Sequence, residues 1–257
     1  MTPLDEAHAA MQAAPEDDTA RLRFYERVAD AELYLLLEAE AVGDQVTPVL
    51  YADSYVMVFD RAERLAEHVG AEAPFVALSG RAIAGMLEGQ PLGLAVNIGV
   101  APSEILLPAE AMAWLRDTLA NEAGEVEVRL DRVLPPGGLP EVVIAALDAK
   151  LATATGMAAG AFLVEVVHDT GGRGHLLAFV GAQPRAEGAL VRAASEALTF
   201  SGVEAGAMDV GFFAPDDPMV AKLAKVGLRF DLPQGEGLQQ TPRLAPGMDP
   251  AKPPILK

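Results

Sequence analysis

The stretch FLVEVVHDTGGRGHLLAFV, residues 162–180, decides the fold class of this chain. Two apolar runs, 162–167 and 175–180, lie on either side of the glycine-dense segment 169–174. Strand-length apolar runs joined by a short connection rich in glycine are typical of a β-hairpin, whose two strands pair antiparallel. The stretch therefore predicts an antiparallel sheet in this half of the chain, instead of parallel strands that alternate with helices.

The rest of the second half mixes strands and helices around this hairpin. Val126, Val128 and Leu130 alternate with charged residues, which predicts a half-buried strand. A helix is expected over 140–153, another over 185–200, and a third that Asp216 and Asp217 cap and that ends at Gly227. Short apolar runs at 208–213 and 228–232 predict two further strands.

The first half shows the same mixture of elements. Pro15 breaks a first helix over 4–14, and a second helix follows it. The continuous apolar run 32–38 reads as a buried strand, and Pro48 within 46–51 suggests a strand start or an edge strand. Further strands are expected at 55–59, 75–78, 92–97 and 105–107, and further helices at 61–69, 81–87 and 108–120.

Both halves therefore indicate the α+β class, with a small, mostly antiparallel or mixed sheet and packed helices in each. The 257 residues exceed the usual size of one domain. Residues 121–124, Asn-Glu-Ala-Gly, break the pattern, so we expect domains over 1–122 and 123–233. Residues 234–257 are rich in proline, glycine and glutamine and predict an extended tail.

Composition narrows the classes of function. The chain contains no cysteine, which excludes disulfides, thiolate nucleophiles and cysteine-ligated zinc. Residues 1–14 do not resemble a signal peptide, and no run approaches the roughly 20 apolar residues that cross a bilayer. We therefore expect a soluble, cytoplasmic protein without membrane association.

The net charge of −18 argues against a nucleic-acid partner, because phosphates would be repelled. Residues 1–122 hold 21 acidic side chains against seven arginines and no lysine. This asymmetry has two interpretations, a compositional bias that favours solubility and a first domain that meets a protein partner with a basic surface.

The candidate chemistry is confined to the predicted hairpin. His168 and His175 flank its connection, with Asp169 and Arg173 between them, so two histidines and one aspartate could form part of a metal site. An anion-binding turn and an ordinary hairpin explain the same residues. No catalytic residue and no cofactor is predicted, because the chain lacks a P-loop, a dinucleotide fingerprint and a Gly-x-Ser-x-Gly motif. Trp114 is expected in the core.

An ordered set of segments in the first half resembles the N-terminal domain of the SseB family, the enhanced serine sensitivity proteins. The segments are residues 4–7, 21–27, 31–36, 56–60, 64–65, 74–78, 94–99 and 104–108. The second half, to about Leu232, is similar in layout to the C-terminal domain of that family. The resemblance implies a bacterial cytoplasmic protein, and the family offers no catalytic residues that could be carried over.

These observations favour a non-enzymatic interaction or regulatory protein. Two alternatives stay open: an enzyme with a cryptic site, metal-assisted at the hairpin, and a small-molecule sensor linked to amino-acid (serine) metabolism.

Overall fold

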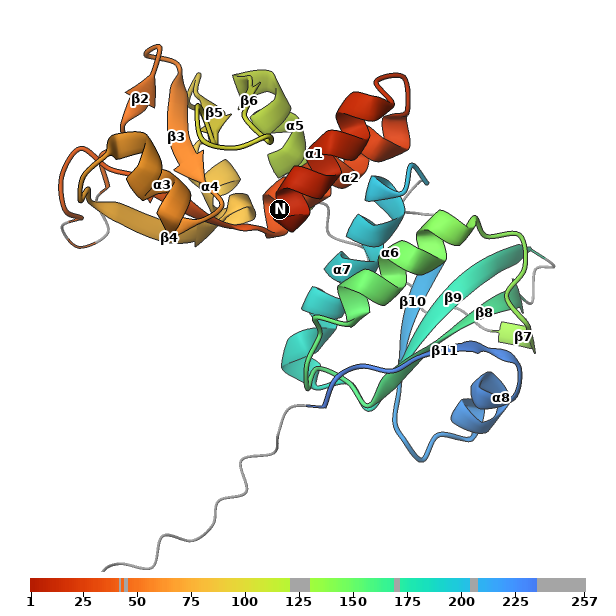
Figure 1. Ribbon diagram of the computed structural model, residues 1–257. Helices are drawn as coiled ribbons and strands as arrows, with labels where there is room; N and C mark the ends of the chain where they lie inside the picture. The colour runs from red at the N-terminus through yellow and green to blue at the C-terminus, as the bar shows by residue number, and fades with distance from the viewer. Residues whose placement is uncertain (42, 44–45, 121–129, 169–171, 204–207, 235–257) are drawn as a thin grey trace, which may run out of the picture.

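The computed structural model describes residues 1–41, 43, 46–120, 130–168, 172–203 and 208–234. They form two lobes, residues 1–120 and residues 130–234, each with its own sheet (Figure 1). The α+β class predicted from the sequence is confirmed. The boundary expected at 122/123 and the tail from 235 lie outside the described residues, and so does most of the strand predicted from Val126.

The first lobe begins with two helices and then builds a sheet. Thr2 caps the first helix with a capping box, in which its hydroxyl accepts from the Asp5 amide and the Asp5 carboxylate accepts from the Thr2 amide. The elements are α1 (Pro3–Ala13), α2 (Asp18–Asp30), β1 (Glu32–Leu36), β2 (Leu50–Tyr51), β3 (Tyr55–Phe59), α3 (Ala62–Val69), β4 (Phe75–Ser79), α4 (Gly80–Met86), β5 (Gly93–Val96), β6 (Ile105–Leu107) and α5 (Ala109–Leu119).

The sheet of the first lobe has the strand order β4-β1-β3-β5-β6, with β2 beside β3. Only β3 and β5 run parallel among its pairs; the others are antiparallel. The strand predicted over 46–51 is wrong in extent, because only Leu50 and Tyr51 pair with β3, and Pro48 forms a single bridge to Leu37. Proline has no amide hydrogen for the ladder, which limits this segment.

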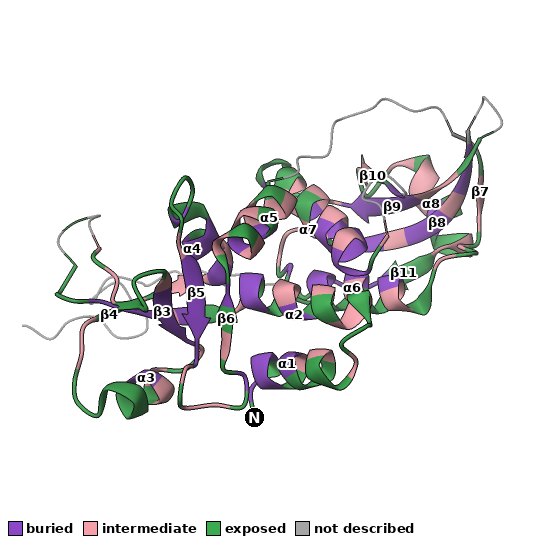
Figure 2. Ribbon diagram, turned by 90° about the horizontal axis from the view of Figure 1, so that it is seen from above, coloured by how far each residue is buried: buried purple, intermediate pink, exposed green. Residues whose placement is uncertain are grey.

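Both faces of the central strands β3 and β5 are buried, which explains the continuous apolar runs in these strands. Val56 and Val58 of β3 join the core beneath α1, α2, α4 and α5. Met57 and Phe59 point to the opposite face, where α3 packs through Leu65. Figure 2 shows β3 and β5 in the colour of buried residues between these layers.

The second lobe contains the predicted hairpin. Strands β8 and β9 pair antiparallel over eight residue pairs, from Gly160↔Val180 to Val167↔Arg173. The sheet order is β10-β9-β8-β11, with β7 also on β8, and only β9 and β10 run parallel among these pairs. The elements are β7 (Leu130–Leu134), α6 (Glu141–Leu151), β8 (Gly160–His168), β9 (Arg173–Val180), η1 (Pro184–Ala186), α7 (Glu187–Phe200), β10 (Met208–Phe213), α8 (Pro218–Val226) and β11 (Leu228–Phe230).

Helices cover both faces of the second sheet as well. Leu163, Leu177 and Phe179 pack against α6 and α7. Val164 and Val166 face α8, whose Leu223 is fully buried. Asp217 caps α8 by accepting a 2.7 Å hydrogen bond from the Met219 amide, as the sequence predicts.

A close approach between α2 and α4 sets the position of α4. At Gly80, the first residue of α4, an added Cβ would lie 1.8 Å from the carbonyl oxygen of Val28, far inside van der Waals contact. Gly85 lies in the same helix, and an added Cβ there would have open space. Only the first glycine is therefore required by packing.

We expect Gly80→Ala and Gly85→Ala to change stability in opposite directions. The first variant forces α4 away from α2 and should lower the free energy of unfolding by more than about 2 kcal/mol, as overpacking against backbone does. The second should raise it by about 0.5–1 kcal/mol, because alanine restricts the unfolded chain and favours a helix. Urea denaturation of both variants beside the wild type measures the difference, and equal effects would contradict the packing argument.

Candidate functional site

A buried polar network fixes the start of α1 on the first sheet. Arg64 of α3 donates to both carboxylate oxygens of Asp5, at 3.0 and 2.6 Å, and to Asp60 at 2.7 Å. The hydroxyl of Ser103 donates to Asp5 at 2.5 Å, and the hydroxyl of Thr2 donates to Asp60 at 2.6 Å. These contacts join residues up to 98 positions apart, so they hold α1 in one place.

Asn97 completes this network from the end of β5. It is fully buried with a φ of 51°, a left-handed conformation that asparagine tolerates better than most residues. Its side-chain Nδ2 donates to the Ser103 hydroxyl at 2.9 Å, and its side-chain Oδ1 accepts from the Asp60 backbone amide at 3.1 Å. Because the members bond to one another inside the lobe, the network is best explained as a structural support.

Opposing effects set the pKa of Asp5. Burial alone raises the pKa, but the hydrogen bonds from Arg64, from Ser103 and from the Thr2 amide outweigh it and hold the pKa well below its usual range. The ionised carboxylate is therefore the form that the folded lobe stabilises.

A second cluster of charges joins the two lobes. Lys150 of α6 is almost completely buried, and its Nζ lies 2.6 Å from Asp30, 2.9 Å from Glu196 and 3.5 Å from Glu26. Arg81 of α4 reaches the same acids, at 2.9 Å from Glu196 and 2.7 Å from Asp30. We call these five residues the interlobe cluster; α2 and α4 supply three of them, and α6 and α7 supply the other two.

The members of this cluster change one another's pKa. Burial disfavours the charge on Lys150, but Asp30 and Glu196 outweigh that cost and raise its pKa. Burial likewise raises the pKa of Glu196, yet hydrogen bonds from Arg81 and the charge of Lys150 bring it below its usual range. Glu26 differs, because burial dominates there and raises its pKa. The charged forms of Lys150 and Glu196 are thus mutually stabilised.

Three aromatic rings in contact, those of Phe200, Trp114 and Tyr25, lie beside the interlobe cluster. Phe200, the last residue of α7, is buried in the apolar core of the first lobe. Its ring meets Trp114 of α5 with 6.3 Å between ring centroids, and Trp114 in turn meets Tyr25 of α2 at 5.2 Å. Trp114 is 39% exposed, so its expected place in the core is wrong; it lies where the lobes meet.

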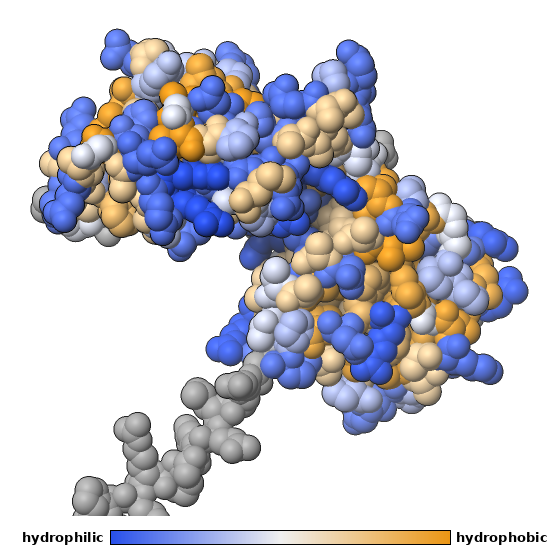
Figure 3. All heavy atoms as spheres, in the orientation of Figure 1, coloured by the Kyte–Doolittle hydropathy of each residue, from blue (hydrophilic) through white to orange (hydrophobic). Residues whose placement is uncertain are grey.

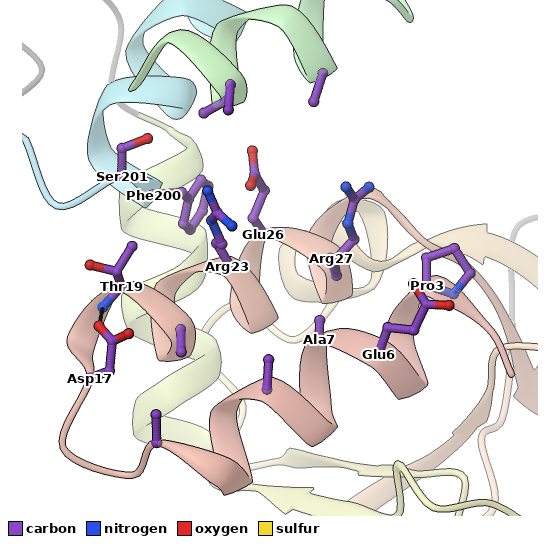
Figure 4. A pocket seen from close by; sticks show the side chains of 16 residues that line it. Pro3, Glu6, Ala7, Asp17, Thr19, Arg23, Glu26, Arg27, Phe200 and Ser201 are labelled. Atoms are coloured by element: carbon purple, nitrogen blue, oxygen red, sulfur yellow. Dashed lines mark hydrogen bonds between the residues drawn. The ribbon is translucent and has the colours of Figure 1, made fainter. Parts of the chain in front are cut away.

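A groove runs along this junction. It has a volume of about 520 Å³, with α1 and α2 on one side and α6 and the end of α7 on the other (Figure 4). Hydrophobic surface of the second lobe lies directly beside the junction in Figure 3. Small side chains supply much of the lining: Ala7, Ala10, Ala14, Ala20, Ala145, Ala146 and Ala149.

Two arginines of α2 stand out among the charged residues that line the groove. Arg23 and Arg27 are exposed, lie one helical turn apart and extend from α2 at the groove (Figure 4). Within the described parts of the chain, no ion pair or side-chain hydrogen bond involves either guanidinium. By contrast, Glu26 between them is held by Lys150 of the other lobe.

The residues proposed for a metal site do not meet as cross-strand partners. His175 pairs with Glu165, and its Nε2 donates a 2.8 Å hydrogen bond to the carbonyl oxygen of Gly137. His168 pairs through its backbone with Leu130, while its side chain and Asp169 lie outside the described residues. Arg173 forms an ion pair with Glu165 at 2.9 Å. The described residues contain no group of three or more His, Asp or Glu suited to a metal ion.

The histidines of the first lobe serve its packing. The sequence suggests a solvated His8, which is wrong, since the ring is buried against Phe24 at 5.6 Å between centroids. His68 is exposed, and its Nδ1 donates to the carbonyl oxygen of Ile98 at 2.8 Å.

The comparison with protein families identifies the first lobe. Residues 4–114 match the model of the SseB protein N-terminal domain, a range that begins in α1 and ends in α5. By this match, the first lobe is an SseB N-terminal domain. The SseB match thus covers the Asp5 network and the α1–α2 side of the groove, whereas the C-terminal resemblance stays a prediction. No curated protein and no solved structure matches the chain.

Among the described residues, no helix is long and apolar enough to span a membrane.

Sequence reasoning missed the interlobe cluster and the groove. Lys150 is 120 residues from Asp30, and Arg81 is 115 residues from Glu196, so no local spacing links them. One local signal was available: Arg23 and Arg27 lie four residues apart on a predicted helix, which places both on one face.

Replacing Lys150 with methionine should destabilise the fold strongly. The variant leaves Glu26, Asp30 and Glu196 close together without their main cation, and an unpaired buried charge typically costs about 3–5 kcal/mol. Lys222→Met, at an exposed position on α8, is the matched control and should change stability by less than about 0.5 kcal/mol. Urea denaturation at neutral pH checks both; a similarly small effect at Lys150 would contradict its bridging role.

Because of Asp5, the stability of the first lobe should decrease at acidic pH. Its folded pKa is below the unfolded value, so its contribution is complete above about pH 5 and falls as the pH decreases through the folded pKa. Asp5→Asn should lower stability at pH 7 and flatten the decline between about pH 5 and pH 2, because a neutral side chain does not titrate. Urea denaturation across this range should show no such flattening in Asp231→Asn, whose position is exposed.

Proposed function

We propose that this protein is a non-enzymatic cytoplasmic interaction or regulatory protein of the SseB family, and that it binds a protein partner in the interlobe groove. The observation that carries the proposal is the groove itself, with small side chains on both sides and with Arg23 and Arg27 of α2, which form no ion pair with any other described residue. Large side chains would fill such a junction, whereas alanines leave room for a partner to approach the helices closely.

The interlobe cluster supports a preformed binding surface. Glu26 belongs both to the cluster and to the lining of the groove, so the contacts that set the lobe arrangement also set one side of the groove. A surface held in place before binding costs less ordering free energy when the partner arrives. The cysteine-free composition suits a reducing compartment.

A bulky side chain in the groove should prevent the partner from binding. Ala145 lines the groove and is exposed, so Ala145→Trp adds bulk there without disturbing a core. Ala224→Trp, at an exposed alanine of α8, is the matched control. In affinity capture from native lysate, wild type and the control should retain a stoichiometric protein that Ala145→Trp loses. Equal retention by all three, or no stoichiometric protein at low or high salt, would contradict the proposal.

A small-molecule sensor is the second candidate. The volume of the groove lies within the range of roughly 300–1,000 Å³ that is typical of small-ligand sites. Affinity capture with the Ala145→Trp and Ala224→Trp variants distinguishes the two candidate functions, because a sensor would retain no stoichiometric protein in any form of the chain.

A further inference from the structure

The shape of the groove indicates what kind of segment it accepts, an inference that rests on the proposed function. Its lining includes Pro3 at the first position of α1 and Ala14 just beyond the last one. The groove therefore follows the whole of α1, whose 11 residues span about 16 Å at 1.5 Å per residue. Such a length suits three turns of a helix better than a compact small molecule.

The walls of the groove favour a helix over an extended peptide. An extended segment gains affinity by pairing its backbone with the open edge of a sheet. Here the lining comes from helices α1, α2, α6 and α7, whose backbone groups are largely used within the helices. A helix satisfies its own backbone hydrogen bonds, so it can lie against these walls and needs only side-chain contacts.

The cationic side chains that remain available in the groove favour acidic side chains on the bound segment. Lys150 and Arg81 are occupied by the acids of the interlobe cluster, whereas Arg23 and Arg27 form no ion pair within the described residues. Four residues along α2 separate the backbone positions of the two arginines by about 6 Å of helix rise. Two carboxylates three or four residues apart on a facing helix have nearly the same spacing, and arginine forms two-pronged hydrogen bonds with carboxylates.

We propose that the groove binds an amphipathic α-helix of another protein, which presents small or apolar residues to the alanines and two acidic side chains, one turn apart, to Arg23 and Arg27. A second copy of this chain is a poor occupant, because two molecules of net charge −18 repel each other. The same charge, with Glu6 and Asp17 at the groove, favours basic residues on the rest of the partner.

A helix library tests this assignment without knowledge of the natural partner. Sixteen-residue helices displayed on phage, with randomised charges on one face, are selected against the full-length protein. The selected helices should carry Asp or Glu pairs three or four residues apart. Against Arg23→Glu/Arg27→Glu, their affinity should fall at least about tenfold, a difference of about 1.4 kcal/mol. Arg192→Glu/Arg229→Glu changes the net charge equally at exposed positions outside the groove and should leave affinity within about threefold.

Charge exchange gives the sharper test. A selected helix whose acid pair is replaced by lysines should regain binding to the Arg23→Glu/Arg27→Glu protein, and a central proline in the original helix should abolish binding to wild type. Arg23→Gln/Arg27→Gln serves as a second variant if the charge reversal reduces the urea midpoint. The assignment would be overturned if the selected helices lacked acid pairs, or if they bound all variants equally. It would also be overturned if no selected helix depended on the groove, or if the protein self-associated in a way that the arginine variants abolish.

Two variants distinguish failure of the acidic-helix proposal from failure of the proposed function. If the partner captured from lysate is lost with Ala145→Trp but kept with Arg23→Glu/Arg27→Glu, the groove binds a protein and the acidic helix is wrong. If neither variant affects capture, both proposals fail.

Discussion

The relative position of the two lobes depends on Lys150. Its ammonium group is buried between α6 and the acids of α2 and α7, where a cation without partners would be very costly. A buried ion pair adds little net stability compared with an apolar contact of the same shape, but losing one member is expensive. The lobes can therefore move relative to each other only if several charges lose their partners together.

Attraction and alignment come from different contacts at this junction. Phe200 brings apolar surface of α7 into the first core, and burial of such surface is favourable without being directional. Lys150 and Arg81 act at defined distances and angles, so they select one alignment among those that the apolar contact would allow. Gly80 contributes indirectly, because its close approach to Val28 places α4, and hence Arg81, within reach of Asp30.

The sequence predicts much of the fold but little of the junction. Alternation, apolar runs and the glycine-dense connection predict β8, β9 and most helices because these signals act within a few residues. They failed at 46–51, where pairing with β3 is limited to Leu50 and Tyr51, and at His8, whose burial depends on Phe24 of a different helix. The interlobe cluster unites residues from four helices, and pairing across such distances leaves no periodic trace in one sequence.

The single tryptophan of the chain occupies an informative place. Trp114 belongs to the first lobe, yet its indole makes a T-shaped contact with Phe200 of the second lobe, and the residue is partly exposed to solvent. Its emission should therefore respond to separation of the lobes before either core is lost. The protein thus carries an intrinsic optical probe of the junction between its lobes, which needs no added label and has no competing indole elsewhere in the chain.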